Sequence, residues 1–234
     1  MSNEMEIVDK LVYLIISGKY KAHDKLPSEN EIADQYKLPR ITVRKAYERL
    51  GELGYIYKKQ GKGSYVKDRY KQIELVLSGD VSFSQKMMEK GYDFQSETIF
   101  CREIKYNKKI CDYLETDEDD RIFKVGRLRY IDQVPIALHI SYIAKSVFND
   151  IDVVGMDITS MFKYYHSKGY MEFCSKPSIL SVCYPTKSQR NMLNCTYLIP
   201  LLVLESGCTE KSTGTVLEYT RILYRSDFFS YVIP

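Results

Sequence analysis

Apolar residues recur at helical spacing along the N-terminal part of the chain, and this pattern predicts three helices. They span about 5–17, 29–36 and 41–53. Ser28 and Glu31 have the S-x-x-E spacing of a capping box, which marks the start of the second helix. Pro39 separates the second helix from the third, because proline is excluded from a helix interior. Two short helices joined this tightly predict a helix-turn-helix.

Each predicted helix has an apolar face that we expect to point inward. In the second helix this face consists of Ile32, Ala33 and Tyr36. In the third helix it consists of Ile41, Val43, Ala46, Tyr47, Leu50 and Leu53. The other face of the third helix carries Arg40, Thr42, Arg44, Lys45 and Arg49. A basic second helix of such a pair is typical of one that enters a DNA groove.

A basic hairpin is predicted after the third helix. Residues 55–58 and 64–67 are β-prone, and the run Lys59-Gln60-Gly61-Lys62-Gly63 lies between them. Glycine accepts the positive φ angles that tight hairpins need. A glycine-tipped hairpin in this place predicts a wing, which approaches a duplex closely because glycine has no side chain.

Alternating apolar and polar positions dominate the rest of the chain and predict an antiparallel sheet. The clearest strands span 121–130, 134–143 and 216–225. Helices are expected at about 157–168 and 187–195, and a short one is expected to end near Gly91. The second domain is therefore predicted to be α+β, with its helices against one face of the sheet. We expect the first domain at 1–68, a linker at 69–78 and the second domain at 79–234.

Composition fits a soluble two-domain protein. The chain has 234 residues, of which 44% are hydrophobic and 28% charged. No apolar run approaches the roughly 18 residues that span a bilayer, and the polar N-terminus does not resemble a secretory signal. We therefore expect a cytoplasmic protein without a membrane segment. The six cysteines form no C-x-x-C pair and none adjoins a histidine, which predicts reduced, mostly buried thiols and no metal or cofactor.

Charge is distributed unevenly along the chain. The net charge is +3, but residues 37–69 carry 10 basic and 3 acidic side chains, whereas residues 71–234 carry 20 and 21. A basic stretch beside a neutral, larger domain fits a surface that attracts phosphates. A solvated charged face would give the same count, so charge alone leaves both interpretations open.

The segment from Leu26 to Val66 resembles the GntR family of winged-helix regulators. The similar motifs are L-P-S-E at 26–29, T-V-R at 42–44, the L-G-Y end of the third helix and Q-G-K-G-S-Y-V at 60–66. The motifs are dense over these 41 residues, so the resemblance is specific. It implies a DNA-binding protein with a recognition helix and a wing.

The resemblance also implies roles for single residues. Arg40, Thr42 and Arg44 would contact DNA, and the wing, with Gly61, Lys62 and Gly63, would reach the minor groove. An arginine offers guanine O6 and N7 a two-pronged hydrogen bond. Lys45 and Arg49 lie further along the helix and are either phosphate contacts or surface charges. Pro39 stands where the family usually has serine or threonine, so one contact to the DNA backbone is expected to be absent.

Two arginines lie on one face of the strand predicted at 121–130. Arg127 and Arg129 share this face with Phe123 and Val125, and would lie about 7 Å apart along the strand. They are either surface charges on an exposed edge or a clamp for a phosphate or carboxylate. Their apolar neighbours favour a sheltered clamp.

The second domain resembles the UTRA effector domain, which defines the HutC branch of GntR regulators. The similar segments are SFSQKMMEKGY, the RLRY and VPIALHISYI strands, and EYTRILYRSDFFSYV near the C-terminus. The resemblance implies the fold of chorismate lyase, an enzyme, used here as a ligand sensor. It therefore implies that this chain is not an enzyme.

By that resemblance, a small effector binds in a pocket on the sheet. The residues implied are Ser82, Ser84, Arg127, Arg129, His139, Ser160, Phe162, Glu218 and Tyr224. The two arginines would hold an anionic group such as a sugar phosphate, with the serines beside it. Glu218 and Tyr224 would face the other end of the ligand. Phe162 stands where some relatives have a tyrosine.

His139 replaces a glutamate that many members of this branch have. An imidazole offers no carboxylate to an ammonium group, which argues against an amino-sugar phosphate as effector. A buried His139 that makes one structural hydrogen bond is an equally good interpretation of this residue.

Three functions follow from these observations. The first is a ligand-controlled repressor, a homodimer that reads a palindromic operator and is released by a small anionic metabolite. The second is a DNA-binding protein whose C-terminal domain only dimerises. The third is an enzyme with a DNA-binding appendage, for which the sequence shows no nucleophile elbow, metal constellation or phosphate loop. The first function is the one we expect.

Overall fold

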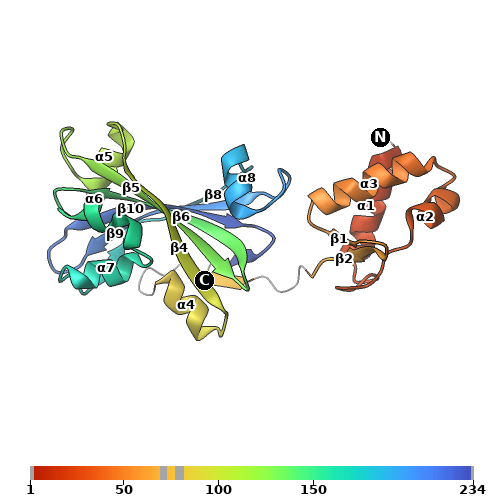
Figure 1. Ribbon diagram of the computed structural model, residues 1–234, viewed down its shortest axis with the longest axis horizontal. Coiled ribbons are helices and arrows are strands. Elements are labelled where there is room, and N and C mark those ends of the chain that lie inside the picture. The colour runs from red at the N-terminus through yellow and green to blue at the C-terminus, as the bar shows by residue number, and fades with distance from the viewer. Residues whose placement is uncertain (1–2, 69–72, 77–81, 233–234) are drawn as a thin grey trace. The chain divides into compact units, whose positions relative to one another are not determined.

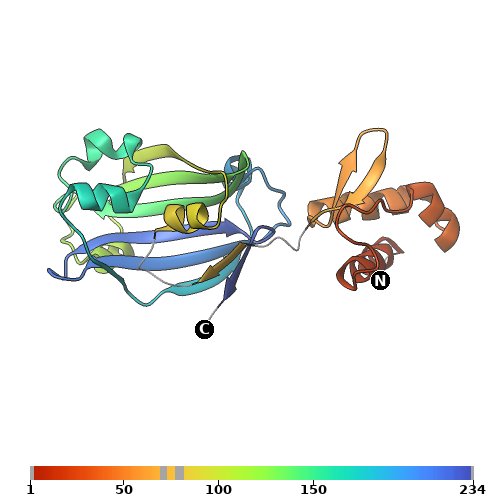
Figure 2. The same ribbon diagram turned by 90° about the horizontal axis from the view of Figure 1, so that it is seen from below.

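The protein divides into two compact units, which are drawn in Figures 1 and 2. The computed structural model describes residues 3–68, 73–76 and 82–232. The main boundary between the units lies between Glu74 and Leu75, inside the linker predicted at 69–78. Two short segments, 195–199 and 227–230, group with the first unit.

The first unit contains a helix-turn-helix followed by a hairpin. Its elements are α1 (Asn3–Ile16), α2 (Glu29–Tyr36), α3 (Arg40–Glu52), β1 (Ile56–Lys59) and β2 (Gly63–Val66). The capping box is present, since Ser28 Oγ accepts a hydrogen bond from Glu31 N and Glu31 Oε2 accepts one from Ser28 N. At the hairpin tip, Gly61 and Gly63 have φ angles of +70° and +109°. The predicted elements and both signals are confirmed.

The core of the first unit lies among its three helices and the hairpin. It consists of Ile7, Val8, Leu11, Ile15, Leu26, Ile32, Ala33, Val43, Ala46, Tyr47, Leu50, Ile56 and Val66. Two residues expected to point inward do not: Tyr36 is 38% exposed and Ile41 is 58% exposed. Each lies at the end of its helix next to the connection at 37–39.

The second unit is built on one antiparallel sheet. Its strands are β4 (Phe94–Glu103), β5 (Ile122–Ile131), β6 (Val134–Ala144), β7 (Phe173–Ser175), β8 (Ile179–Cys183), β9 (Leu201–Glu210) and β10 (Val216–Arg225). The strand order is β4-β5-β6-β10-β9-β7, and β8 also pairs with β9. The late strand β10 thus lies between β6 and β9, in the middle of the sheet.

Helices cover both faces of this sheet, so the expectation that they cover one face is wrong. The helices are α4 (Phe83–Glu89), α5 (Lys108–Leu114), α6 (Ile151–Val154), the 3₁₀ turn η1 (Gly155–Asp157), α7 (Met161–Ser167) and α8 (Lys187–Leu193). Helices α6 and α7 pack with Phe123 and Val125, whereas α5 packs with Ile122, from the opposite face of the same strand. In Figure 1, α5 and α8 lie above the sheet and α4 and α7 below it.

A strand also lies inside the predicted linker. Residues Ile73–Val76 form β3, which pairs with β11 (Phe229–Val232) in a small separate sheet. The remainder of the predicted linker, 69–72 and 77–78, lies outside the described residues. The linker is therefore not wholly irregular, because a late segment of the chain supplies β3 with a hydrogen-bonded partner.

Candidate functional site

Helix α3 presents the four residues singled out for DNA contact near its N-terminus. Arg40, Arg44 and Lys45 are exposed and Thr42 is half-buried. The opposite side of the helix is anchored in the core by Val43, Ala46, Tyr47 and Leu50. The helix is thus fixed by its apolar side, and its basic side faces solvent.

Two of these arginines are paired with carboxylates in the free protein. Arg40 Nε lies 3.6 Å from Glu29 Oε2, and Arg44 Nε lies 3.0 Å from Glu48 Oε1. The Arg40 and Arg44 side chains are 67% and 60% exposed. Exposed ion pairs are worth roughly 0–1 kcal/mol. Phosphates or base edges can therefore replace these carboxylates at little cost.

The wing lies close to the start of α3. Arg40, Lys62 and Gly63 line one shallow groove of about 280 Å³. Helix α3 is capped by Pro39 without any side-chain hydrogen bond, as expected for a proline in this place. The structure thus brings together helix and wing residues that are more than twenty positions apart in sequence.

Sequence analysis did not identify the aromatic and cation–π contacts that stabilise the wing. The Tyr57 and Tyr65 rings stack across the hairpin at 5.9 Å, and Lys59 Nζ lies 4.6 Å from the Tyr65 ring and 5.6 Å from the Tyr57 ring. Alternating aromatic residues on paired strands were the available signal. The contact keeps Lys59 on the hairpin face and leaves Lys62 at the exposed tip.

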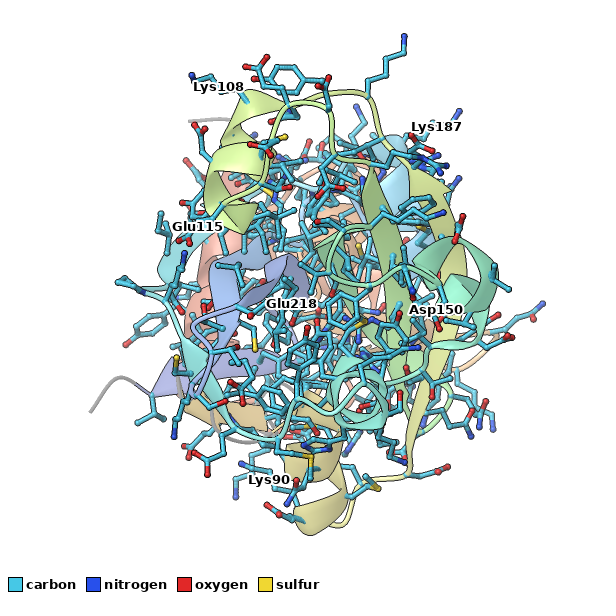
Figure 3. All side chains as sticks on the ribbon, turned by 90° about the vertical axis from the view of Figure 1, so that its left-hand side faces the viewer. Lys90, Lys108, Glu115, Asp150, Lys187 and Glu218 are labelled. Atoms are coloured by element: carbon cyan, nitrogen blue, oxygen red, sulfur yellow. The ribbon has the colours of Figure 1, made fainter. Side chains whose placement is uncertain are left out.

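A pocket of about 190 Å³ lies in the second unit, on the sheet face covered by α4 and α7. All nine residues implied for the effector line it: Ser82, Ser84, Arg127, Arg129, His139, Ser160, Phe162, Glu218 and Tyr224. They come from three strands and two helices with their caps. Figure 3 shows Glu218 inside the domain, whereas Lys90, Lys108 and Lys187 lie at its rim.

The two arginines are buried rather than on an exposed edge. Arg127 and Arg129 are each 3% exposed, and β5 lies between β4 and β6 and not at an edge of the sheet. Arg127 Nη2 donates to Ser141 Oγ at 2.6 Å, and Arg129 Nη1 donates to Thr159 O at 2.9 Å and to Ser96 Oγ. Among the described residues, the Nε atom of each arginine has no acceptor. Each guanidinium is thus fixed in place but incompletely paired.

The pocket carries an excess of positive charge. Lys86, Arg127 and Arg129 line it together with the carboxylate of Glu218. Burial lowers the pKa of both arginines, and for Arg129 the charge of Arg127 lowers it further. Both remain charged near neutral pH, because arginine does not lose its proton in proteins. A buried anion would therefore be attracted here, and it would offset the cost of burying these charges.

An aromatic cluster forms another wall of the pocket. The His139 ring lies 4.8 Å from the Phe83 ring and 5.6 Å from the Tyr224 ring. Burial, with Arg129 and Arg127 nearby, holds the pKa of His139 well below its usual value of 6.5. The imidazole is therefore neutral at physiological pH, and its Nε2 atom has no partner in the part of the chain that the structure describes. A structural hydrogen bond at Nε2 is not found.

Hydroxyl groups line the rest of the pocket, and sequence analysis identified only some of them. Ser82 and Ser160 cap α4 and α7, since their Oγ atoms accept from Gln85 N and Lys163 N. Each hydroxyl keeps a hydrogen to donate. The pocket residues that were missed include Lys86, Ser175, Ser178, Ser206, Thr220 and Tyr231. Thr220 lies two residues from both Glu218 and Ile222 on β10, so the alternating pattern of this strand could have identified it. The serines lie in segments that show no clear alternation of apolar and polar residues.

Side chains that could bind a metal ion are not clustered among the described residues. The described residues include no group of three or more histidine, cysteine, aspartate or glutamate side chains that could hold a metal ion. None of the six cysteines, all of which lie in the described ranges, forms a disulfide bond. Only Cys111 and Cys208 are buried, so the expectation of mostly buried thiols is wrong. Within the same described ranges, no helix has the length and apolar character needed to cross a membrane.

The fold and these two sites define a DNA-binding regulator with a sensor domain. Family models match the chain twice: "Bacterial regulatory proteins, gntR family" over residues 3–66 and "UTRA domain" over residues 89–230. The chain belongs to the GntR family of bacterial transcription regulators, in the HutC branch that carries an effector-binding UTRA domain. This family consists of regulators and not of enzymes, which excludes the enzyme alternative.

Proteins with similar sequences are also named as transcription regulators. The chain is 26% identical, over 97% of its length and 93% of the relative's, to the mannosyl-D-glycerate transport/metabolism system repressor MngR of Escherichia coli K12. It is 27% identical, over 80% of its length and 76% of the relative's, to the probable fructoselysine utilization operon transcriptional repressor of the same strain. The crystal structure of PhnF from Mycobacterium smegmatis has the same fold. It has a TM-score of 0.62 and 18% identity, and the match covers 100% of this chain and 98% of that one.

Proposed function

We propose that this chain is a repressor that leaves its operator when a small anionic sugar derivative, such as a sugar phosphate, fills the pocket of the second unit. The main observation in support of this proposal is the pair of buried arginines, Arg127 and Arg129, whose Nε atoms lack acceptors among the described residues. The hydroxyl-lined walls and the aromatic wall suit a sugar body. Relatives named for mannosyl-D-glycerate and for fructoselysine support a sugar-derived effector.

Size and charge limit the effector further. Typical ligand sites span roughly 300–1,000 Å³, whereas this pocket has about 190 Å³, so the effector is small. Three cations and one carboxylate favour a dianion such as a phosphate monoester over a monocarboxylate. Neutral His139 offers no charge to an ammonium group, which disfavours an amino-sugar phosphate.

On the DNA side, we propose contacts from two elements. Arg40, Thr42, Arg44 and Lys45 would enter the major groove on α3, and the wing, with Gly61, Lys62 and Gly63, would lie along the minor groove. Exposure of the basic side of α3 and the positive φ angles of the wing glycines support these roles. A cytoplasmic homodimer that reads a palindromic operator would follow from this mode of binding.

The experiment is an operator-release assay on the full chain. Operator sequences are selected from random duplexes, and fluorescence anisotropy follows their release by sugar phosphates, the parent sugars and small carboxylates. We expect release by a phosphate, and a thermal shift that reflects about 2.7 kcal/mol at 100 times the dissociation constant. Both responses should be lost in the Arg127→Gln plus Arg129→Gln double variant.

The matched control is Arg102→Gln, since Arg102 is exposed and does not line the pocket. This variant should respond as the wild type does. Equal release by a sugar and its phosphate would contradict the anion clamp. Operator binding that no ligand alters, even one shown to occupy the pocket, would favour the alternative in which the second domain only dimerises. Two observations argue against a domain that only dimerises: its own side chains do not fill the pocket, and buried polar atoms that line the pocket lack hydrogen-bond partners among the described residues.

A further inference from the structure

Ile41 is exposed on the helix that carries the candidate DNA contacts. It is the second residue of α3, and its side chain is 58% exposed. The inward positions of this helix are occupied by Val43, Ala46, Tyr47 and Leu50. Packing within the unit therefore does not account for a large apolar side chain at position 41.

Helical spacing places Ile41 among basic residues. Positions three and four apart lie on the same side of a helix, so Ile41 shares its stripe with Arg44 and Lys45. Both of these are exposed, and Arg44 is the residue that Glu48 holds in the free protein. Ile41 is thus an apolar group in the middle of a polar, cationic stripe.

Local stability does not account for this isoleucine either. A β-branched residue is a poorer helix former than alanine, lysine or glutamine, because its side-chain freedom is restricted in a helix. A single exposed apolar residue is unremarkable on an ordinary surface. On the side of α3 that is proposed to face DNA, however, an exposed apolar side chain can contact an apolar group of a base.

The major groove offers one prominent apolar group, the C5-methyl of thymine, which distinguishes thymine from the other bases. We propose that Ile41 packs against a thymine methyl in the operator and is a specificity-determining residue of this regulator. The arginines beside it would read hydrogen-bonding edges, so α3 would combine polar and apolar recognition. This inference rests on the proposed role of α3 in DNA binding.

The test removes the methyl group from the DNA rather than from the protein. Operators selected by the full chain are remade with single thymines replaced by deoxyuridine, which keeps base pairing and loses only the methyl. For wild type we expect one position in each half-site of the operator where this change weakens binding roughly three- to fivefold, the value of one buried methyl group. At that position Ile41→Ser should bind thymine and uracil equally, and Ile41→Val should keep part of the preference.

The matched control is Ile16→Ser, the same change at an isoleucine that is 63% exposed on α1. It should leave every thymine preference intact, which separates a groove contact from a general effect of surface polarity. If wild type and Ile41→Ser lose the same affinity at every uracil, the proposal is wrong although the protein binds DNA. If the wild type selects no sequence at all, the proposed DNA-binding role of α3 fails and this proposal fails with it.

Discussion

His139 shows how a single residue sets the character of the pocket. Its neighbours in the sheet are Arg127 on β5 and Ile222 on β10, and Phe83 packs over its ring. A protonated imidazole beside two buried guanidinium groups would be strongly unfavourable, so the ring is held neutral. Position 139 thus contributes a neutral hydrogen-bonding group to the pocket, and not the negative charge of the glutamate that the family resemblance implies for this place.

The neutral state of His139 predicts a pH-dependent stability. Its pKa is below 6.5 in the folded protein and near 6.5 in the unfolded chain, so the unfolded chain takes up the proton first as pH falls. The contribution of neutral His139 to the free energy of unfolding is thus fully present above about pH 6.5. Below that pH the contribution decreases by up to about 1.4 kcal/mol per pH unit. His139→Phe should remove this slope.

Urea unfolding of the full chain at about pH 7 and about pH 5.5, followed by tyrosine fluorescence, measures the slope. The control is His166→Gln, because His166 is exposed and does not line the pocket. His139→Phe should show a smaller loss of stability at the lower pH than wild type, and His166→Gln should behave as wild type does. An unchanged slope in His139→Phe would show that other groups cause the pH dependence.

At the scale of elements, sequence periodicity located some parts of the fold and not others. Helix α2 and strand β10 have the predicted bounds, because each has a complete repeat bounded by a clear start or stop. Strand β8 was missed because its side chains are mostly exposed, so its sequence shows no alternation. Helix α5 was also not predicted from the sequence.

The pocket could be predicted only through the family resemblance. Alternation along β5 and β10 placed Arg127 with Arg129, and Glu218 with Thr220, on common faces. It does not say that β10 pairs with β6, which brings these faces together. The exposure of Ile41 could not be predicted from the helical repeat either. The repeat shows which side of a helix is apolar, but it does not show how far along that side another element packs.

The face of the sheet opposite the pocket gives a prediction for strand packing. On this face the Phe100 ring of β4 lies over Gly126 of β5, with Arg102 5.1 Å and Lys124 5.6 Å from the ring. A methyl group on Gly126 would collide with this ring. Gly126→Ala should therefore destabilise the domain by roughly 1–3 kcal/mol, the cost of overpacking.

Thermal unfolding measures this cost, since about 1 kcal/mol lowers the midpoint by roughly 2–4 °C in a domain of this size. Gly207→Ala on β9 is the control, because an added methyl would come no closer than 3.4 Å, to the flexible Lys176 side chain. It should change the midpoint little. Equal midpoints for the two variants would mean that Phe100 moves aside without cost.

At the scale of the whole molecule, the effector and the operator act on one equilibrium. Each ligand shifts the protein only by its preference for one conformation over another. Thermodynamic linkage then requires that both ligands weaken each other by the same factor.

Linkage gives a quantitative prediction for the intact protein. If a sugar phosphate that fills both pockets of the proposed homodimer raises the operator dissociation constant tenfold, the operator should raise the product of the two effector dissociation constants tenfold, which is about threefold for each pocket and a total coupling of about 1.4 kcal/mol. Calorimetric titration of the effector into the free protein and into the operator complex measures one side, and anisotropy measures the other. Unequal factors would show that the two sites do not share a simple equilibrium, for example because the effector also binds DNA-contacting residues.

The place of β10 between β6 and β9 has a consequence for how the protein is made. The core of the first unit lies within residues 7–66, whereas the pocket needs residues 218–224. At about 5–20 residues per second, a ribosome takes roughly eight to thirty seconds to go from one to the other. During that interval a nascent chain has its recognition helix but an unfinished sensor, with the edge of β6 unpaired. A chain that ended before Val216 would carry the recognition helix and the wing but would lack the pocket residues of β10.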